Sequence, residues 1–303
     1  MNSQTRKILL LSFILISLGV GLLSNPRHQP QTVPSSAVLP QIEQDIQYQY
    51  HSLGNSVVHT LLIPAGSRFS VMPAVSQKVS TLVSFAHQHQ ALAVINGGFF
   101  DPQNQKSTSY VVQQGVIVAD PRLNERLFNN PRLAPYLAKI LDRTEFRRYR
   151  CGQTVRYDLT LHSEPTPPNC QLIDAIGGGP RLLPAPTLVA EGFLDKANGQ
   201  VIRDPLGSNQ PNARSAVGIT GEGSILWVMV AQKPESPTSS GMSLEALAAF
   251  MRNLGVEKAM NLDGGSSSSL YYKGKTFYGK VDEKGNPLQR KVLSVLLVRE
   301  NQP

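Results

Sequence analysis

The sequence predicts an α+β fold with a mixed, mostly antiparallel sheet core and flanking helices, formed by a single domain over residues 46–303. Runs rich in β-branched residues are paired around glycine turns, as in residues 213–232, which is typical of hairpins. Helical patterns stand between strands in places, but hairpins dominate. No repeat of fixed period and no Rossmann-type unit occurs.

The N-terminal segment predicts export. Arg6 and Lys7 precede residues 8–23, which are apolar and carry no charge. Residues 1–23 are therefore expected to be a signal peptide or an N-terminal membrane anchor, followed by a Pro/Gln/Ser-rich tether at 24–45. No small-x-small cleavage site follows closely, so removal and retention stay equally open. Either outcome places the body in the periplasm or at the cell surface, in the second case anchored in the inner membrane by residues 8–23.

Strands are expected where β-branched and apolar residues stand between turn residues. These segments are residues 56–64, 68–75, 91–95, 154–162, 213–220, 225–232, 259–262 and 292–298. Residues 109–120 predict a hairpin, and residues 122–148 predict a polar, partly helical excursion.

Two helices are expected from apolar periodicity. Residues 78–90 place Val79, Leu82, Val83 and Ala86 on one face. The second helix has Ser243 as its N-cap and Gly255 as its stop. Its apolar stripe consists of Leu244, Leu247, Phe250, Met251 and Leu254.

The chain is basic, with a formal charge of +8 and a pI near 9.5. Its basic residues are scattered apart from a run at 143–150. Zinc-finger spacing, RNP-like aromatic motifs and basic heptads are lacking, so no nucleic-acid partner is expected. An acidic small or polymeric substrate fits the charge equally well.

Two cysteines, Cys151 and Cys170, predict a disulfide because an exported protein meets an oxidising compartment. A metal site is the weaker alternative, since there are only two thiols and no neighbouring histidine cluster.

Three strand ends are rich in glycine: Asn96-Gly97-Gly98, residues 177–179, and Asp263-Gly264-Gly265. Glycine allows positive φ and close approach of backbone amides to a ligand, so three such turns meeting in one place could hold an anion. Taken singly, each is an ordinary turn.

Arg214 and Asp263 each have two interpretations. A guanidinium in a strand of small and apolar residues can bind a phosphate or carboxylate bidentately, or can pair with a structural carboxylate. An Asp before Gly-Gly can act in a reaction, or can simply accept hydrogen bonds from turn amides. Residues 274–280 match the start of a P-loop, but Val281 replaces its Ser or Thr, so this motif is rejected.

Five motifs, "INGGFF", "GGGPRLL", "ARSAVGIT", "GMSLEALA" and "NLDGGSSS", occur in this order between about residues 91 and 298. Together they resemble the phosphodiester glycosidase family. The resemblance implies hydrolysis of the bond between a sugar's anomeric carbon and a phosphodiester oxygen, with a sugar-phosphate glycan as substrate. It implies that Asn96, Arg214 and Asp263 are catalytic. The implied substrate-binding residues are Gly97, Gly98, Gly178, Gly179, Arg181, Gly264, Gly265 and Ser266.

The resemblance also implies roles. Arg214 and clustered glycine amides would hold the phosphate, and Asn96 would orient the sugar or a water. Asp263 would act as nucleophile, base or electrostatic stabiliser, and the sequence leaves these three open. Ala213 and Ser215 depart from the family's usual Pro and Thr, and Ser266 replaces a frequent third glycine, which puts the specificity in doubt.

No metal-ligand constellation is visible, so no cofactor is expected, although a carboxylate site has room for a divalent cation. The alternative function is a non-catalytic glycan-binding or envelope-assembly protein that retains the same pocket. A third hypothesis is a protein that binds polyanions through its net positive charge.

Overall fold

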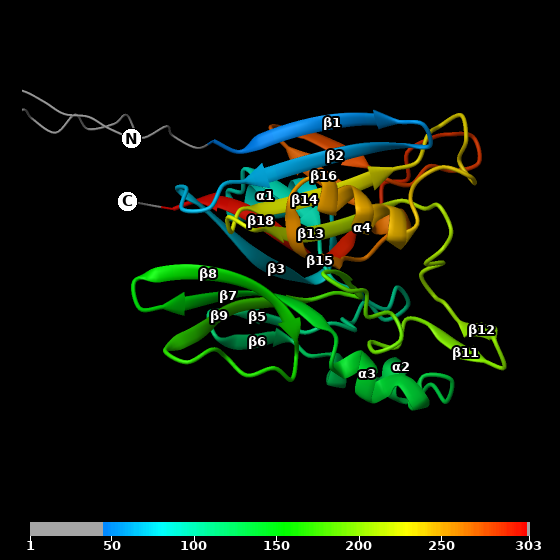
Figure 1. Ribbon diagram of the computed structural model, residues 1–303, viewed down its shortest axis with the longest axis horizontal. Helices are drawn as coiled ribbons and strands as arrows, with labels where there is room; N and C mark the ends of the chain where they lie inside the picture. The colour runs from blue at the N-terminus through cyan, green and yellow to red at the C-terminus, as the bar shows by residue number, and fades with distance from the viewer. Residues whose placement is uncertain (1–44, 302–303) are drawn as a thin grey trace, which may run out of the picture. The chain divides into compact units, whose positions relative to one another are not determined.

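The computed structural model describes residues 45–301, whose strands form three larger sheets and one small hairpin (Figure 1). Every pairing between the described strands is antiparallel. The predicted α+β class with a mostly antiparallel core is thus confirmed. Several of the ladders join strands that are far apart in the sequence, such as β2 with β14 and β3 with β18.

The first sheet has six strands and contains the predicted 213–232 hairpin at its centre. Its order is β1 (Gln47–Leu53), β2 (Ser56–Ile63), β14 (Ile225–Ala231), β13 (Arg214–Thr220), β15 (Val256–Asn261) and β10 (Arg181–Leu183). All seven residues of β14 are buried. The sequence analysis missed β1, because this edge strand reads QYQYHSL and is mostly solvent-exposed, so it has no apolar alternation to detect.

The second sheet has five strands and carries helix α1 (Leu82–His89). Its order is β17 (Lys275–Tyr278), β16 (Ser269–Tyr272), β4 (Ala93–Asn96), β18 (Val292–Glu300) and β3 (Phe69–Ser80). The helix predicted over residues 78–90 begins later than expected, since β3 continues to Ser80 by pairing with Val292. Thr81 then caps α1 by accepting a hydrogen bond from the Ser84 amide.

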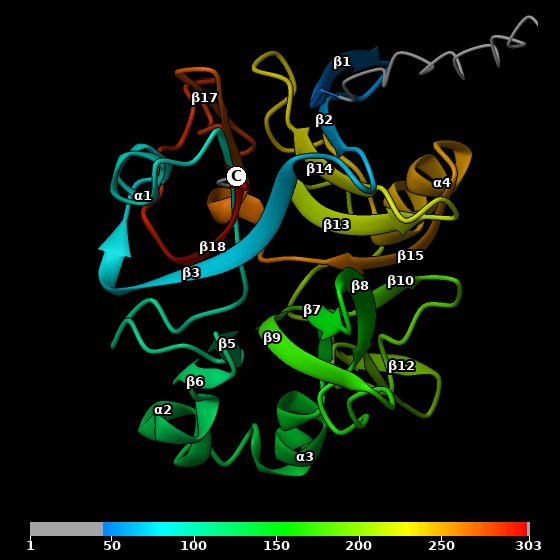
Figure 2. The ribbon, with the colours of Figure 1, turned by 90° about the vertical axis from the view of Figure 1, so that its left-hand side faces the viewer.

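The third sheet also has five strands and lies beside the excursion at residues 121–141 (Figure 2). Its order is β6 (Val116–Ala119), β5 (Val111–Gln113), β9 (Cys170–Gly177), β7 (Thr144–Cys151) and β8 (Thr154–Leu161). The excursion holds η1 (Pro121–Leu123), α2 (Glu125–Phe128), η2 (Ala134–Tyr136) and α3 (Leu137–Leu141). The sequence analysis extended this partly helical region to residue 148, which is wrong because β7 begins at Thr144 and pairs with both β8 and β9.

Helix α4 (Leu244–Asn253) packs against the first sheet, on the opposite side of the view from α1 (Figure 2). Ser243 caps it as predicted by accepting a hydrogen bond from the Ala246 amide. Leu244, Leu247 and Met251 are buried against β10 and β15. Leu254 is not part of the packed stripe, because it stands at the C-cap and is 37% exposed.

One apolar core joins the three sheets. It includes Trp227 of the first sheet, Ile95 of the second and Phe146 of the third, each at most 2% exposed. Full burial of each such side chain stabilises the fold by about 1.5–3 kcal/mol. Since all three sheets share this core, strands far apart in the sequence end close to one another.

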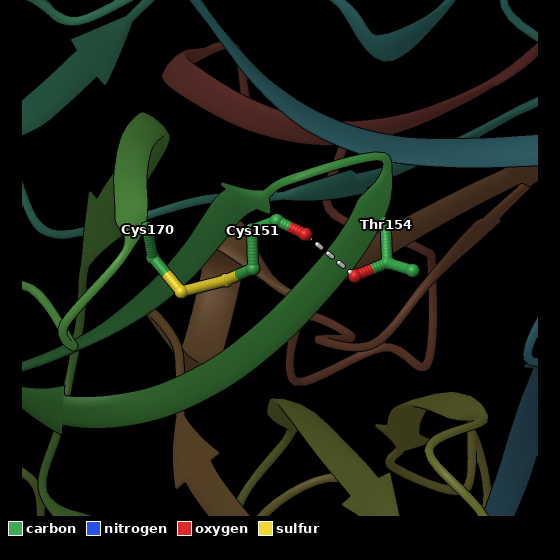
Figure 3. The surroundings of a disulfide bond; sticks show 3 residues. All are labelled: Cys151, Thr154 and Cys170. Carbon is green, nitrogen blue, oxygen red and sulfur yellow. Dashed lines mark hydrogen bonds between the residues drawn. A yellow bond between two sulfur atoms is a disulfide. The ribbon is translucent and has the colours of Figure 1, made fainter.

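Cys151 and Cys170 form the predicted disulfide (Figure 3). The two residues are register partners at the ends of β7 and β9, with their Cα atoms 4.1 Å apart. The Thr154 hydroxyl donates a hydrogen bond of 2.9 Å to the Cys151 carbonyl and closes the adjacent β7–β8 turn. The bridge therefore secures the outer end of the third sheet.

Within residues 45–301, no helix has the length and apolar character needed to cross a membrane. The predicted signal or anchor at residues 8–23 and most of the predicted tether lie outside the described residues.

Candidate functional site

Asn96 lies where the ends of several strands meet. Its Nδ2 donates a 2.6 Å hydrogen bond to the Asp263 carbonyl. Its Oδ1 accepts hydrogen bonds from the Ser215 hydroxyl at 2.7 Å and from the Ser269 amide at 3.1 Å. The Asn96 side chain is fully buried, so it ties β4, β13 and β16 to the loop after β15. Within the described residues, both polar atoms of the Asn96 side chain are thus hydrogen-bonded to the protein, while the predicted contact with the sugar or a water stays a prediction.

Asp263 stands at the start of that loop, directly above Asn96. Its amide donates to the Gly97 carbonyl at 3.0 Å, and the preceding Leu262 amide donates to the Ser215 carbonyl at 2.8 Å. The chain then turns sharply: Gly265 adopts a φ of 58° and opens a short 3-10 helix, η3 (Gly265–Ser267). The strand-to-turn transition predicted at Asp263 is therefore present.

The Asp263 carboxyl has an unusual environment. The residue is partly exposed, yet burial of its carboxyl raises the pKa to about 6. Hydrogen bonds from the Ser267 side chain and the Gly264 amide, together with the charge of Arg290, oppose that rise in pKa. The carboxyl is thus a titratable group poised near neutral pH, which is the range in which acid–base and nucleophilic groups work.

The serines after Asp263 have separate tasks. Ser267 interacts with the Asp263 carboxyl, and Ser269 donates its hydroxyl to the Ser267 carbonyl at 2.9 Å. Ser268 is buried and its hydroxyl has no hydrogen-bond partner among the described residues. Ser266, a predicted substrate-binding residue, is partly exposed next to Gly265.

Arg214 begins β13 near this loop, and its guanidinium is held by backbone carbonyls. Its donors reach the carbonyls of Leu206 (2.9 Å), Gly207 (2.8 Å), Gln210 (2.9 Å) and Met242 (2.9 Å). Burial lowers the pKa of Arg214 to about 10, and the charge of Asp204 opposes that shift. Arg214 therefore remains protonated at neutral pH and holds the 206–210 loop. Most of its donors are bound to backbone carbonyls, whereas the sequence analysis expected them to hold the phosphate.

The glycine amides that were expected to bind phosphate are mostly used by the fold. Gly97 donates to the Ser294 carbonyl, Gly178 to the Thr144 carbonyl and Gly179 to the Asn261 carbonyl. Gly98 donates to the Ser294 hydroxyl and Gly265 to the Ala213 carbonyl. The three glycine-rich turns do lie close together. Their glycines allow one backbone segment to pack closely against another.

Gly98 shows this packing role most clearly. A Cβ at this position would lie 2.3 Å from the Gly177 carbonyl oxygen and 2.9 Å from Ser109. We expect Gly98→Ala to lower the free energy of unfolding by about 3 kcal/mol, since backbone atoms cannot move aside cheaply. Urea denaturation measures this. Gly54→Ala is the matched control, because its Cβ would meet nothing within 4 Å, and its expected change is below about 0.5 kcal/mol. Equal stability of both variants would contradict the packing role.

Arg181 and Glu191 flank the site on the side of β10. The Arg181 amide donates to the Glu191 carboxylate at 2.9 Å, while the buried Arg181 Nε has no partner among the described residues. Glu191 is fully buried and also accepts hydrogen bonds from the Thr144 amide (2.9 Å) and hydroxyl (2.7 Å), and from the Thr187 hydroxyl. Glu191 thus fixes the backbone at Arg181, a role that the sequence analysis did not assign to it.

The sequence analysis missed three residues that surround the Asp263 loop. Arg290 is partly exposed, with its guanidinium carbon 5.5 Å from the centre of the Phe100 ring. Lys280 donates its ammonium to the Asn212 side-chain oxygen at 3.3 Å, and Asn212 precedes the Ala213 carbonyl that receives the Gly265 amide. The sequence analysis considered Lys280 only as part of the rejected P-loop match at residues 274–280.

Among residues 45–301, no group of three or more His, Cys, Asp or Glu side chains is arranged to hold a metal ion. The Asp263 carboxyl instead has the positive charge of the Arg290 guanidinium near it, which makes a pair of opposite charges. Such a pair can hold an anionic ester while the carboxyl acts on the adjacent atom.

Comparison with known proteins identifies the family of this chain. The model of the phosphodiester glycosidase family matches residues 89–299, a range that contains all the predicted site residues. A search of curated proteins finds no match.

Two solved structures share the fold. The catalytic domain of zebrafish N-acetylglucosamine-1-phosphodiester alpha-N-acetylglucosaminidase, auto-inhibited by its pro-peptide, has a TM-score of 0.60 at 17% identity, covering 84% of this chain and 82% of that one. A hypothetical protein from Synechocystis has a TM-score of 0.54 at 17% identity, covering 84% of this chain and 61% of that one. At such identities the likeness shows a common fold alone.

Proposed function

Since this chain belongs to the phosphodiester glycosidase family, we propose that it is an exported hydrolase that cleaves the bond between a sugar's anomeric carbon and a phosphodiester oxygen. The observation that carries the proposal is the Asp263 carboxyl, with its pKa raised to about 6 at the junction of the family-like motifs. The substrate class is a sugar-phosphate glycan of the envelope or extracellular space. An N-acetylglucosamine 1-phosphodiester is the first compound to test, because the zebrafish relative's name specifies it.

The chemistry suits a single catalytic carboxylate. The bond from the anomeric carbon to the phosphate oxygen breaks, its electron pair leaves with the phosphate monoester, and water supplies the new oxygen on the sugar. A phosphate monoester leaves more easily than an alcohol, so less is required of a general acid than in ordinary glycoside cleavage. With a pKa near 6, Asp263 is mostly ionised at neutral pH and can accept the proton of the attacking water or attack the anomeric carbon itself.

Each supporting residue then has a role consistent with its contacts. Asn96 holds the Asp263 backbone, and the Ser267 side chain orients the carboxyl. Arg214 holds the 206–210 loop beside the site. The Cys151–Cys170 disulfide supports the exported location, because such bonds persist in oxidising compartments.

The proposal is tested with a panel of sugar 1-phosphodiesters in ¹⁸O-labelled water. The expected result is release of sugar and phosphate monoester, with the label in the sugar hydroxyl as detected by mass spectrometry. Label in the phosphate would instead show cleavage of the P–O bond and would overturn the proposed reaction. Binding of the panel without product release would favour a non-catalytic glycan-binding or envelope-assembly protein.

A further inference from the structure

We propose that the substrate's phosphate is bound by Arg290 and Lys280, two cations of the 279–291 hairpin beside Asp263. This inference rests on the proposed function, because it assigns the anion-binding half of the same site. It replaces the assignment of the phosphate to Arg214 and the glycine amides, whose donors are largely spent on backbone carbonyls.

The hairpin is fixed directly to the wall of the site. The Gly279 amide donates to the Ser268 carbonyl at 2.7 Å, and the Gly279 carbonyl accepts from the Gln232 amide at 2.8 Å. The Leu288 amide donates to the Lys280 carbonyl at 2.8 Å, and Val281 is bridged to Pro287. Lys280 and Leu288, which stands two residues before Arg290, therefore lie side by side through this backbone hydrogen bond. Both cations are held by ordered structure.

Arg290 has unused binding capacity. Its guanidinium contacts the Phe100 ring, but among the described residues it makes no ion pair and no hydrogen bond. A guanidinium offers five N–H donors in a planar fork that matches two phosphate oxygens. The Phe100 ring that Arg290 contacts, with the guanidinium carbon 5.5 Å from the ring centre, follows four residues after Asn96, whose side chain donates to the Asp263 carbonyl. Arg290 therefore lies on the side of the site formed by residues 96–100, and its positive charge acts on the Asp263 carboxyl.

Lys280 is the second cation of the proposed anion site. Its ammonium has three donors, and one of them is directed to Asn212. Asn212 is connected through the Ala213 carbonyl to the Gly265 amide, so Lys280 lies at the Asp263 loop. Ionised Asp263, Arg290 and Lys280 together carry one net positive charge, which a phosphodiester monoanion would balance.

The test uses isothermal titration of the full-length protein with inorganic phosphate and with N-acetylglucosamine 1-phosphate. We expect Arg290→Met to raise the dissociation constants of both ligands by about 10- to 100-fold. This loss of affinity is typical of a lost hydrogen bond to a charged group. Arg290→Lys should recover part of this affinity. Lys280→Met should cause a smaller loss, about 3- to 10-fold, because a lysine binds phosphate as a point charge.

Lys284→Met is the matched control, since this exposed lysine lies on the same hairpin. The affinity of the Lys284→Met variant for both ligands should stay within about twofold of wild type. Circular dichroism and the thermal midpoint verify that each variant is folded. Wild-type affinity in both Arg290→Met and Lys280→Met would overturn the inference.

Turnover of the phosphodiester panel separates this inference from the proposed function. If the wild type binds the sugar phosphate through Arg290 but releases no product, the anion site stands and the hydrolase proposal fails. If turnover occurs and the Arg290 and Lys280 variants match wild type in KM and affinity, the hydrolase stands and the anion site fails.

Discussion

Asp263→Asn should lower kcat on a sugar 1-phosphodiester by about 10³-fold, because the amide can neither accept a proton nor act as the nucleophile. KM should change little, since the proposed phosphate contacts come from other side chains. In the wild type, kcat/KM should rise as the pH increases through about 6, where Asp263 becomes ionised. The pH profile and steady-state kinetics of both proteins measure these effects. A variant with near-wild-type kcat would remove Asp263 from the reaction.

The same substitution should stabilise the protein at neutral pH. The folded-state pKa of Asp263 is raised to about 6, whereas an unfolded Asp titrates near 3.9. Between these values the folded protein binds more protons than the unfolded chain, so the contribution of Asp263 to stability falls as the pH rises from about 4 to 6. At pH 7.5 the ionised carboxylate therefore destabilises the folded state by roughly 3 kcal/mol, which Asp263→Asn relieves.

This stability change separates a reactive carboxylate from an ordinary turn residue. Denaturant unfolding at pH 7.5 should show the Asn variant as the more stable protein, and the gain should shrink as the pH is lowered toward 4. If Asp263 were kept only for the hydrogen bonds it accepts from Gly264 and Ser267, its replacement would destabilise the fold at pH 7.5.

Arg214→Met should lower the free energy of unfolding by roughly 3–5 kcal/mol. The change removes four hydrogen bonds and leaves the carbonyls of residues 206, 207, 210 and 242 without their buried partner. Arg214→Lys should recover only part of the loss, because a single ammonium cannot match the planar spread of the guanidinium. Urea denaturation of the variants provides the measurement.

Arg290→Met is the comparison for this prediction. Its guanidinium is partly exposed and makes no hydrogen bond among the described residues, so its removal should change stability by less than about 0.5 kcal/mol. A stable Arg214→Met protein with weakened phosphate affinity would show that Arg214 binds substrate and would restore the sequence-based assignment.

The features that depend on local chemistry could be predicted from the sequence. The hairpin at β13 and β14, the Ser243 cap of α4 and the turn at Asp263 follow from β-branched runs, capping residues and glycines. The ordered set of motifs indicated the family, and the two cysteines indicated the disulfide. The edge strand β1 gave no such signal, because its polar residues lack an apolar period.

The partners of each predicted site residue depend on long-range packing and could not be predicted from the sequence. Asn96, Arg214 and Asp263 come from strand ends that meet because three sheets share one core. The sequence could not show that Arg214 faces the 206–210 loop, or that Arg290 comes close to Asp263. Residue type sets what a side chain can donate or accept, but long-range packing sets which partner it meets and how far burial shifts its pKa.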